Sequence, residues 1–279
     1  MADPRSDPHH GLNAPPADEV ARLKAELEAA RQEQETFLRA VSHDLRAPVR
    51  HILAYGRLAR ETVAESTADP EALQFLDTIA QAGQQLGSMI DGLIQLGRIG
   101  SAPATPGAVD LGSALQKAVA VALAAAAAAP QKSPAATADW PNSVQWDLPP
   151  ADDCPTVQAD AGWLHEVLVA LLDNALKFSR GVQSPRIGVQ VQGQGERIAI
   201  AVQDNGAGFP AAQASQLFQV FQRLHPVSQF EGLGLGLARC RRLVTRMGGT
   251  IDIGAAPQQG CTVHLVLTAA SAAPQATSG

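Results

Sequence analysis

A periodic pattern of apolar residues constrains the fold of this chain more than any other feature. From Asp18 onward, apolar residues recur at alternating three- and four-residue spacings with charges between them, which is the pattern of a coiled-coil helix. The positions are Val20, Leu23, Leu27, Ala30, Leu38, Val41, Leu45, Pro48, Ile52, Tyr55 and Ala59. A second apolar stripe runs from Leu76 to Leu93, beyond a turn predicted at Ser66–Pro70. The sequence therefore predicts two long antiparallel helices within residues 18–99.

The apolar stripe is too wide for one hairpin to bury. Pairing of two hairpins into a homodimeric four-helix bundle is the natural way to cover it. On the predicted helix, His43 lies opposite Leu45 and Ile52, so its imidazole should point into solvent. We hypothesise that Asp44 accepts the Nδ1 proton of this ring, which leaves the Nε2 lone pair for nucleophilic attack. Pro48 should bend or loosen the helix nearby.

A second domain of mixed helices and strands is predicted after a linker at residues 100–107. Helical periodicity covers 111–123 and 163–178. Strand-like alternation covers 186–192, 197–203, 250–253 and 261–267. We expect an α/β domain with a largely antiparallel sheet over residues 108–269. The terminal segments 1–17 and 270–279 contain too few large apolar residues to fold and are predicted to be disordered tails.

Composition argues against several classes of function. A formal net charge of -6 without a Lys/Arg cluster disfavours binding to nucleic acid. The three cysteines are far apart and form no CxxC pair, so we expect neither disulfides nor a zinc site. No uninterrupted apolar run of about 18 residues is present, and the N-terminus lacks the apolar core of a signal peptide. We therefore expect a cytoplasmic protein without a membrane partner.

The residues around His43 resemble a known motif. The run Phe37–Pro48, including SHDLRAP, resembles the H-box of histidine kinases in the form found in phytochrome-type kinases. This resemblance implies that His43 is the phosphoacceptor and makes Asp44 the candidate general base or orienting group. Without the resemblance, the same residues would describe a Pro-kinked amphipathic helix with an incidental surface histidine.

Four further segments resemble the ATP-binding motifs of the same family, in the family's order. Residues 171–179 resemble the N-box, 204–209 the first glycine box, 217–224 the F-box and 231–238 the second glycine box. The resemblance implies that Asn174 holds Mg²⁺, Lys177 contacts phosphate and Asp204 accepts from the adenine amine. The remaining predicted nucleotide-binding residues are Gly206, Gly208, Phe209, Arg223, Gly232, Gly234 and Gly236. The joint presence of these four motifs indicates the family far more specifically than any single motif does.

Together the motifs imply a helical phosphoacceptor hairpin followed by an α/β two-layer sandwich of the Bergerat type. The implied reaction is autophosphorylation of His43 from Mg-ATP, followed by transfer to an Asp of a response regulator receiver domain. No sensory domain precedes the helix, so the input is expected from a separate sensor or from one lost on the N-terminal side.

Two departures from the family pattern qualify this interpretation. Ala170 replaces a second Asn of the N-box, and no acidic residue stands there to activate water, which favours transfer over hydrolysis. Ala47 replaces a Thr or Asn that positions water in many members, which predicts weak phosphatase activity. Two alternatives remain open: a regulatory adaptor that docks a kinase or response regulator, and a hydrolytic ATPase of the same fold.

Overall fold

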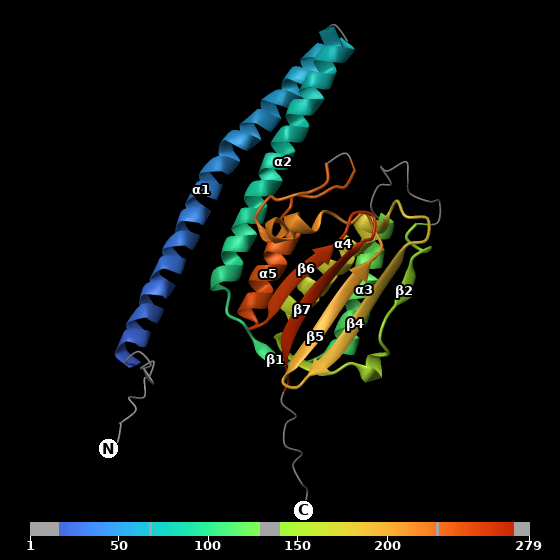
Figure 1. Ribbon diagram of the computed structural model, residues 1–279. Helices are drawn as coiled ribbons and strands as arrows, with labels where there is room; N and C mark the ends of the chain where they lie inside the picture. Colours follow the sequence, from blue (N-terminus) through green and yellow to red (C-terminus); the bar gives the residue numbers. More distant parts are fainter. Residues whose placement is uncertain (1–16, 67–68, 129–139, 227–228, 271–279) are drawn as a thin grey trace, which may run out of the picture.

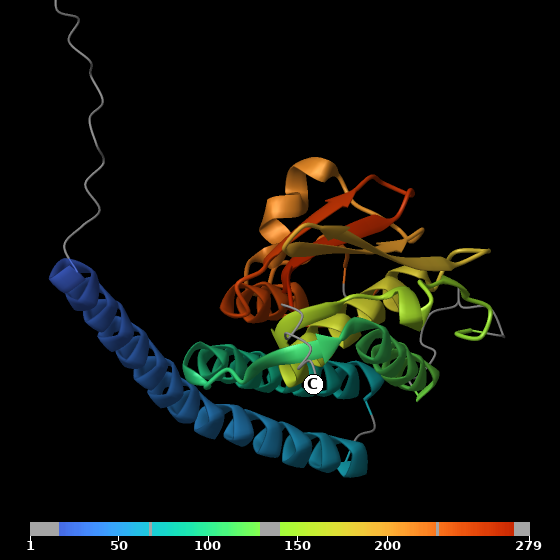
Figure 2. The same cartoon turned by 90° about the horizontal axis from the view of Figure 1, so that it is seen from below.

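The computed structural model describes residues 17–66, 69–128, 140–226 and 229–270. Helix α1 (Ala17–Ser66) and helix α2 (Pro70–Ser101) form an antiparallel hairpin beside an α/β domain (Figure 1). The predicted tails, apart from Ala17 and Ala270, and part of the predicted turn lie outside the described residues. Helix α1 is continuous through Pro48, and Figure 2 shows it bent along its length, as expected for an internal proline.

Local sequence explains where the second helix starts and how the hairpin closes. Asp69 caps α2, and its carboxylate accepts a hydrogen bond from the Glu71 amide at 3.0 Å. Pro70 occupies the first helical turn, where no amide donor is needed. Between the helices, Val49 and Leu53 pack against α2, and ion pairs at 2.6 Å join Arg46 to Asp91 and Arg60 to Asp77.

The face of α1 that contacts α2 is rotated by one residue from the predicted apolar seam. Val49 is 5% exposed, whereas the seam residues Leu45, Ile52 and Tyr55 are 43%, 47% and 70% exposed. One residue along a helix corresponds to a rotation of about 100°, so a single partner helix covers only one edge of a wide stripe. The part of the predicted seam from Val41 to Ala59 is therefore an apolar surface that remains exposed in one chain.

The α/β domain is built on one seven-stranded sheet. The strands are β1 (Pro106–Asp110), β2 (Gln145–Asp147), β3 (Thr156–Asp160), β4 (Arg186–Gln194), β5 (Arg197–Asp204), β6 (Thr250–Ala255) and β7 (Cys261–Ala269). Their order is β1-β3-β7-β5-β4-β2, with β6 also paired to β7, and all pairs except β2 with β4 are antiparallel. The largely antiparallel sheet is thus confirmed.

Three strands and the linker differ from the sequence-based expectation. Strands β1, β2 and β3 were not predicted because they are short and lack a clear apolar alternation. Helix α2 ends at Ser101 and β1 starts at Pro106, so only residues 102–105 connect the two domains outside regular structure. The remaining strands extend the predicted ranges by one or two residues.

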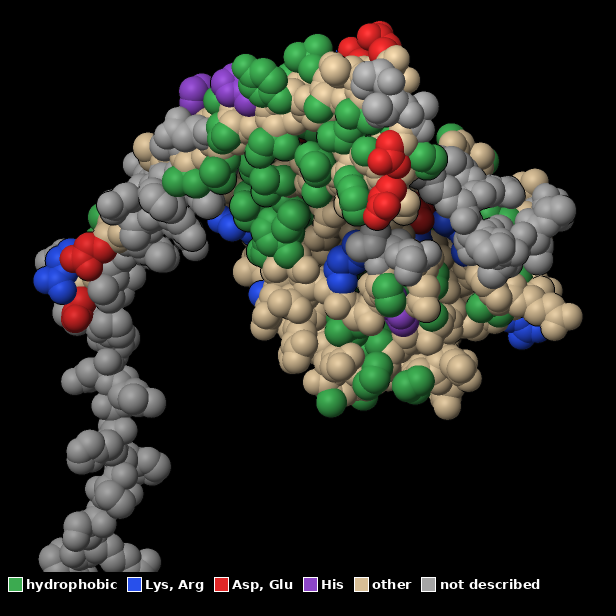
Figure 3. Space-filling view, turned by 90° about the horizontal axis from the view of Figure 1, so that it is seen from above, with side chains coloured by type: hydrophobic (Ala, Val, Ile, Leu, Met, Phe, Trp, Pro, Cys, Tyr) green, Lys and Arg blue, Asp and Glu red, His purple; other side chains and the backbone are tan. Residues whose placement is uncertain are grey.

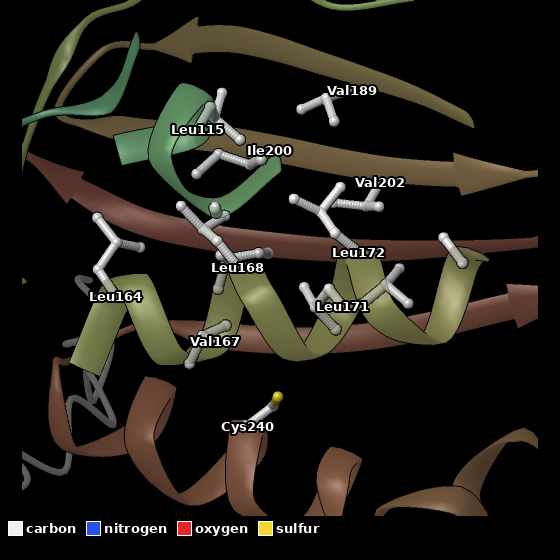
Figure 4. Packing of buried hydrophobic residues seen from close by; sticks show 14 of the residues in the cluster. Leu115, Leu164, Val167, Leu168, Leu171, Leu172, Val189, Ile200, Val202 and Cys240 are labelled. Carbon is white, nitrogen blue, oxygen red and sulfur yellow. The ribbon is translucent and has the colours of Figure 1, made fainter. Parts of the chain in front are cut away.

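Helices cover one face of this sheet, as Figures 1 and 2 show. They are α3 (Leu111–Ala128), α4 (Ala161–Ser179) and α5 (Gly236–Arg246); two short 3-10 helices lie at Ala151–Asp153 and Ala211–Phe218. Figure 4 shows α4 at the centre of the core, where Leu168 and Leu172 lie beside Ile200 and Val202 of β5. Full burial of each such leucine contributes roughly 1.5–3 kcal/mol. The two-layer α/β fold is confirmed.

Asp160 fixes the start of α4 and the end of the interdomain connection. One carboxylate oxygen accepts from the Trp163 amide at 3.0 Å, and the other accepts from the amide and hydroxyl of Thr105 at 2.9 and 2.7 Å. Burial alone would raise the pKa of Asp160, but these hydrogen bonds outweigh it and lower the pKa below its ordinary value. The connection is therefore anchored to the helix that carries the predicted N-box.

The hairpin also packs directly on the α/β domain. Leu96 and Ile99 of α2 belong to the domain's buried core. Arg239 of α5 donates to Gln95 at 3.3 Å, and Arg246 donates to the carbonyl oxygen of Ile99. The end of α2 is therefore part of the domain interface.

One helix among the described residues, α3, is long and apolar enough to cross a membrane by length and composition, with a mean hydropathy of 1.5. It carries Lys117 in its middle, and its buried face, which includes Leu111, Leu115 and Ala118, packs in the core of the domain. Core helices of globular domains commonly have this composition.

Candidate functional site

A pocket of about 460 Å³ opens between α4, β5, the β6–β7 end of the sheet and the start of α5. Nine of the ten predicted nucleotide-binding residues line it: Asn174, Lys177, Asp204, Gly208, Phe209, Arg223, Gly232, Gly234 and Gly236. The tenth, Gly206, lies beside the pocket and donates its amide hydrogen to Asp204 Oδ1 at 2.8 Å. Segments far apart in the sequence thus converge on one site.

Asp204 supplies a buried carboxylate at the end of β5. The residue is only 6% exposed, and Val202, Phe209 and Ile253 line the pocket with it. Burial raises the pKa of Asp204 to about 6, even though amide hydrogen bonds from Gly206 and Cys261 lower it. An acceptor next to apolar walls is suited to a flat heterocycle that carries an amino group.

Basic side chains gather in the same pocket. Lys177 Nζ donates to Asn174 Oδ1 at 3.0 Å and lies 4.6 Å from the centre of the Phe178 ring. Burial, together with the positive charges of Arg223 and Arg180, lowers the pKa of Lys177 against the opposing effect of Asp173 and Glu231. Such a partly desolvated cation is suited to binding an anion.

Arg180 and Arg223 hold the start of the second glycine box and the residue before it. Arg180, at the end of α4, makes two hydrogen bonds to the Glu231 carboxylate at 2.9 and 3.3 Å. Arg223 donates to the carbonyl oxygens of Phe230 and Gly232. The predicted nucleotide-binding residue Arg223 therefore lines the pocket while it holds this segment in place.

Glycine is required at two positions of the pocket wall. Gly234 has a φ of 71°, and a Cβ there would lie 2.6 Å from the Gln222 carbonyl oxygen. Gly208 has a φ of 58°, and a Cβ there would overlap the Ala256 carbonyl oxygen. Helix α5 begins two residues after Gly234. No side chain caps this helix, so no side-chain acceptor competes with a ligand for its first amide hydrogens. A helix start of this type favours an anionic group.

The candidate phosphoacceptor lies outside this pocket. His43 is on α1, exposed as predicted, and is not among the residues that line the pocket. The backbone of Asp44 is helical, but its side chain lies outside the described residues, so its pairing with His43 stays a prediction. Chemistry at His43 thus requires that α1 and the pocket of one chain or of two chains approach one another.

The sequence analysis did not single out His225 and Phe230, which line the pocket, or Arg180, which is not a lining residue but pairs with Glu231 of the pocket wall. Arg180 follows Lys177 by three residues, a spacing that could have placed both on one helix face. His225 and Phe230 lie in an irregular segment, where no periodicity indicates which side chains point inward. Only the tertiary structure brings them to the pocket.

The donor set agrees with a magnesium nucleotide. No group of three or more His, Cys, Asp or Glu residues that could hold a metal occurs in the part of the chain that the structure describes. Asn174 Oδ1 is a suitable oxygen ligand, and Mg²⁺ commonly takes few protein ligands together with phosphate oxygens. Asp204, Lys177 and Asn174 therefore fit a base, phosphates and their metal, respectively, within one pocket.

Models of two known protein families match the chain, one in the helical hairpin and one in the α/β domain. Residues 33–102 match the model of the His Kinase A (phospho-acceptor) domain. Residues 159–271 match the model of the Histidine kinase-, DNA gyrase B-, and HSP90-like ATPase, an ATP-binding domain. The first match contains His43, and the second contains every predicted nucleotide-binding residue.

Individual relatives point the same way. Phytochrome-like protein Cph1 of Synechocystis is 28% identical over 89% of this chain and 31% of its own length. Sensor protein KdpD of Mycobacterium tuberculosis is 33% identical over 91% of this chain and 28% of its own length. The chain thus spans about a third or less of these relatives.

A solved structure has a similar fold. The crystal structure of full-length ShkA in complex with AMPPNP aligns with a TM-score of 0.57 and 23% identity, over 86% of this chain and 47% of that one. The two family domains occur in the same order as the phosphoacceptor and ATP-binding motifs found in the sequence. The chain belongs to the histidine kinase family and contains its helical phosphoacceptor domain and its ATPase domain.

Proposed function

We propose that this chain is an ATP-dependent protein-histidine kinase that phosphorylates His43 and then transfers the phosphoryl group to an aspartate of a response regulator receiver domain. The observation that carries the proposal is the convergence of nine predicted nucleotide-binding residues on one pocket. An exposed histidine in a phosphoacceptor domain of the same chain supplies the acceptor.

Each pocket residue has a role that follows from its chemistry. Bound Mg-ATP supplies the phosphoryl group, with Asn174 Oδ1 as the protein ligand of the metal. Asp204 accepts a hydrogen bond from the adenine amino group, and Lys177 balances phosphate charge. These groups act through positioning and electrostatics, since they supply no covalent intermediate.

On the hairpin, His43 is the nucleophile. The lone pair of Nε2 forms the new bond to phosphorus, and the bond from phosphorus to the ADP oxygen breaks. Asp44 is proposed to hold the Nδ1 proton and to stabilise the positive charge that develops on the ring. Transfer to the receiver aspartate then breaks the bond at Nε2 and restores the neutral imidazole.

The proposal is tested by incubation of the chain with Mg²⁺ and ATP labelled in the γ-phosphate. We expect label on the protein that is stable in alkali and lost in acid, as expected of phosphohistidine. Addition of a cognate receiver domain should move the label to that domain. Absence of label on a chain that binds ATP would instead favour the regulatory adaptor, and steady phosphate release independent of His43 would favour a hydrolytic ATPase.

We further propose that the hairpin forms a homodimer. Of the ten large apolar side chains that are exposed among the described residues, eight lie on the hairpin: Val41, Leu45, Ile52, Tyr55, Leu58, Phe75, Ile79 and Leu86. Figure 3 shows hydrophobic side chains gathered along this part of the molecule. An exposed apolar area of this extent is typical of a protein interface.

If the hairpin forms this dimer, a charged substitution should change the oligomeric state at one of two similarly exposed apolar positions but not at the other. Ile52 and Val121 are 47% and 44% exposed, but only Ile52 lies on the hairpin. Ile52→Asp would bury a carboxylate in the bundle, which costs several kcal/mol. Sedimentation equilibrium should give twice the 29.1 kDa chain mass for the wild type and for Val121→Asp, and a shift to the monomer for Ile52→Asp. Equal masses for the two variants would contradict the proposed interface.

Binding of ATP should weaken in mild acid because of Asp204. The adenine amine needs the ionised carboxylate as acceptor, so binding lowers the pKa of Asp204 from its free value of about 6. Affinity is therefore retained above that pKa and lost as the pH falls through it. The ionised fraction drops about tenfold between pH 7 and pH 5, so the Kd should rise about tenfold by calorimetry.

Asp204→Asn is the matched control for this pH dependence. The amide keeps the shape of the side chain but does not titrate, so only the ionisation of the phosphates remains. We expect a weaker Kd with a clearly smaller change between pH 7 and pH 5. Parallel pH profiles for the two proteins would show that Asp204 is not the titrating group.

A further inference from the structure

Three aromatic rings from two separate segments meet at one wall of the pocket. Phe178 belongs to the last turn of α4, whereas His225 and Phe230 follow the F-box. Ring centroids lie 4.8 Å apart for Phe178 and Phe230, 5.2 Å for His225 and Phe230, and 5.6 Å for Phe178 and His225. These tilted and edge-on arrangements are favourable for aromatic pairs. We call Phe178, His225 and Phe230 the aromatic triangle.

The histidine of the triangle has a second contact that the phenylalanines cannot make. His225 Nε2 lies 3.0 Å from the carbonyl oxygen of Gly208 in the first glycine box. A carbonyl oxygen only accepts, so the ring holds a proton on Nε2 and donates it. His225 therefore joins the first glycine box to the aromatic triangle.

Other contacts also restrict the backbone of the first glycine box near Gly208. A Cβ on Gly208 would overlap the Ala256 carbonyl oxygen, and Gln258 donates its amide hydrogen to Ala207 at 2.8 Å. Ala207 in turn donates to the Phe178 carbonyl oxygen at 3.1 Å. The backbone of the box is thus held by the turn between β6 and β7, by the end of α4, and by His225.

The triangle also reaches the basic part of the pocket. Lys177 Nζ lies 4.6 Å from the centre of the Phe178 ring, in cation–π contact. Asp204 and Gly208 stand four residues apart in one box, and both line the pocket. His225 contacts both Gly208 and Phe178. Through them it affects the position of Asp204, which is proposed to hold the base, and of Lys177, which is proposed to contact the phosphates.

We propose that His225 is a positioning residue for nucleotide binding: it presets the pocket wall by donating to Gly208 and by packing in the aromatic triangle. This inference rests on the proposed function, because ATP is the ligand. His225 acts through Gly208 and Phe178 and takes no part in the transfer of the phosphoryl group. Its loss should therefore raise the Kd and KM for ATP while the rate at saturating ATP stays the same.

The test separates the two contacts of His225. His225→Ala removes both and should raise the Kd for the non-hydrolysable analogue AMPPNP about tenfold by calorimetry. His225→Phe keeps an aromatic ring without the donor, and His225→Gln keeps a donor at a similar distance without the ring; each should give a smaller increase. His264→Ala is the matched control, because His264 is exposed on β7 and does not line the pocket.

Two measurements distinguish positioning from a general loss of stability. The rate of His43 labelling at saturating ATP should stay within about twofold of the wild type, and the Gln variant should recover most of the lost affinity. If His225→Ala fails to fold, the Phe and Gln variants still decide the proposal through their Kd values. A Kd for Ala, Phe and Gln variants equal to that of the wild type, or a fall in the saturating rate with unchanged KM, would overturn it.

AMPPNP binding and His43 labelling of the wild-type chain show whether a failure concerns this inference or the proposed function. A wild-type chain that does not bind AMPPNP would overturn the proposed function and this inference with it. A wild-type chain that binds AMPPNP and labels His43, together with His225 variants of unchanged affinity, would overturn the role of His225 alone.

Discussion

Replacement of His43 by glutamine is expected to remove all incorporation of γ-phosphate label into the protein. Glutamine keeps a polar side chain of similar reach but has no nitrogen lone pair that can attack phosphorus. Because His43 is exposed on α1 and lies outside the nucleotide pocket, ATP binding should be unchanged. Label should fall to the assay background while the Kd for AMPPNP stays at the wild-type value.

His51 provides the matched control for this experiment. It is an exposed histidine on the same helix, eight residues further along, where its ring contacts Tyr55. His51→Gln should keep full labelling. Label that persists in His43→Gln but disappears in His51→Gln would show that the phosphoacceptor had been assigned to the wrong residue.

Replacement of Gly234 by alanine is expected to have the second largest effect, a loss of ATP affinity of about hundredfold. A left-handed backbone costs a non-glycine residue about 1–2 kcal/mol, and the φ of Gly234 is 71°. In addition, the new Cβ would lie 2.6 Å from the Gln222 carbonyl oxygen and 2.8 Å from the Phe221 carbonyl carbon. Both contacts are to backbone, so the loop itself must move.

The displaced loop explains why binding should suffer more than folding. Gly234 accepts a hydrogen bond from the Phe221 amide at 3.0 Å and stands two residues before α5, whose first amides are proposed to face the phosphates. Calorimetry with AMPPNP should report the lost affinity, while circular dichroism remains that of the wild type. Gly254→Ala is the control, since a Cβ at Gly254 meets nothing within 4 Å. Similar affinities for the two variants would refute a steric requirement at Gly234.

Much of the fold was predictable because its long elements carry strong local signals. The helical hairpin follows from apolar spacing over many turns, and β4, β5 and β7 follow from clear alternation. Strands β1, β2 and β3 were missed because segments of three to five residues contain too little periodicity. They become strands only by pairing with neighbours that lie far away in the sequence.

In the candidate site, too, residues within local motifs were predictable, whereas residues that depend on distant partners were not. Asp204, Asn174, Lys177 and the glycines stand in local motifs, whose resemblance to those of the family implies a carboxylate acceptor, a metal ligand, a cation and close backbone approach. Arg180 and His225 belong to no recognised motif, and their partners, Glu231 and Gly208, are distant in the sequence.

Local sequence was thus sufficient for the family, the two domains in order, and the positions of the H-box and the nucleotide motifs, because these depend on residue type and on spacing within one element. The tertiary structure alone decided which edge of the α1 stripe packs on α2, how α2 contacts α5, and how His225 reaches the first glycine box. Each of these depends on contacts between separate elements. Such contacts are set by how whole elements pack and leave no periodic trace in the sequence of either one.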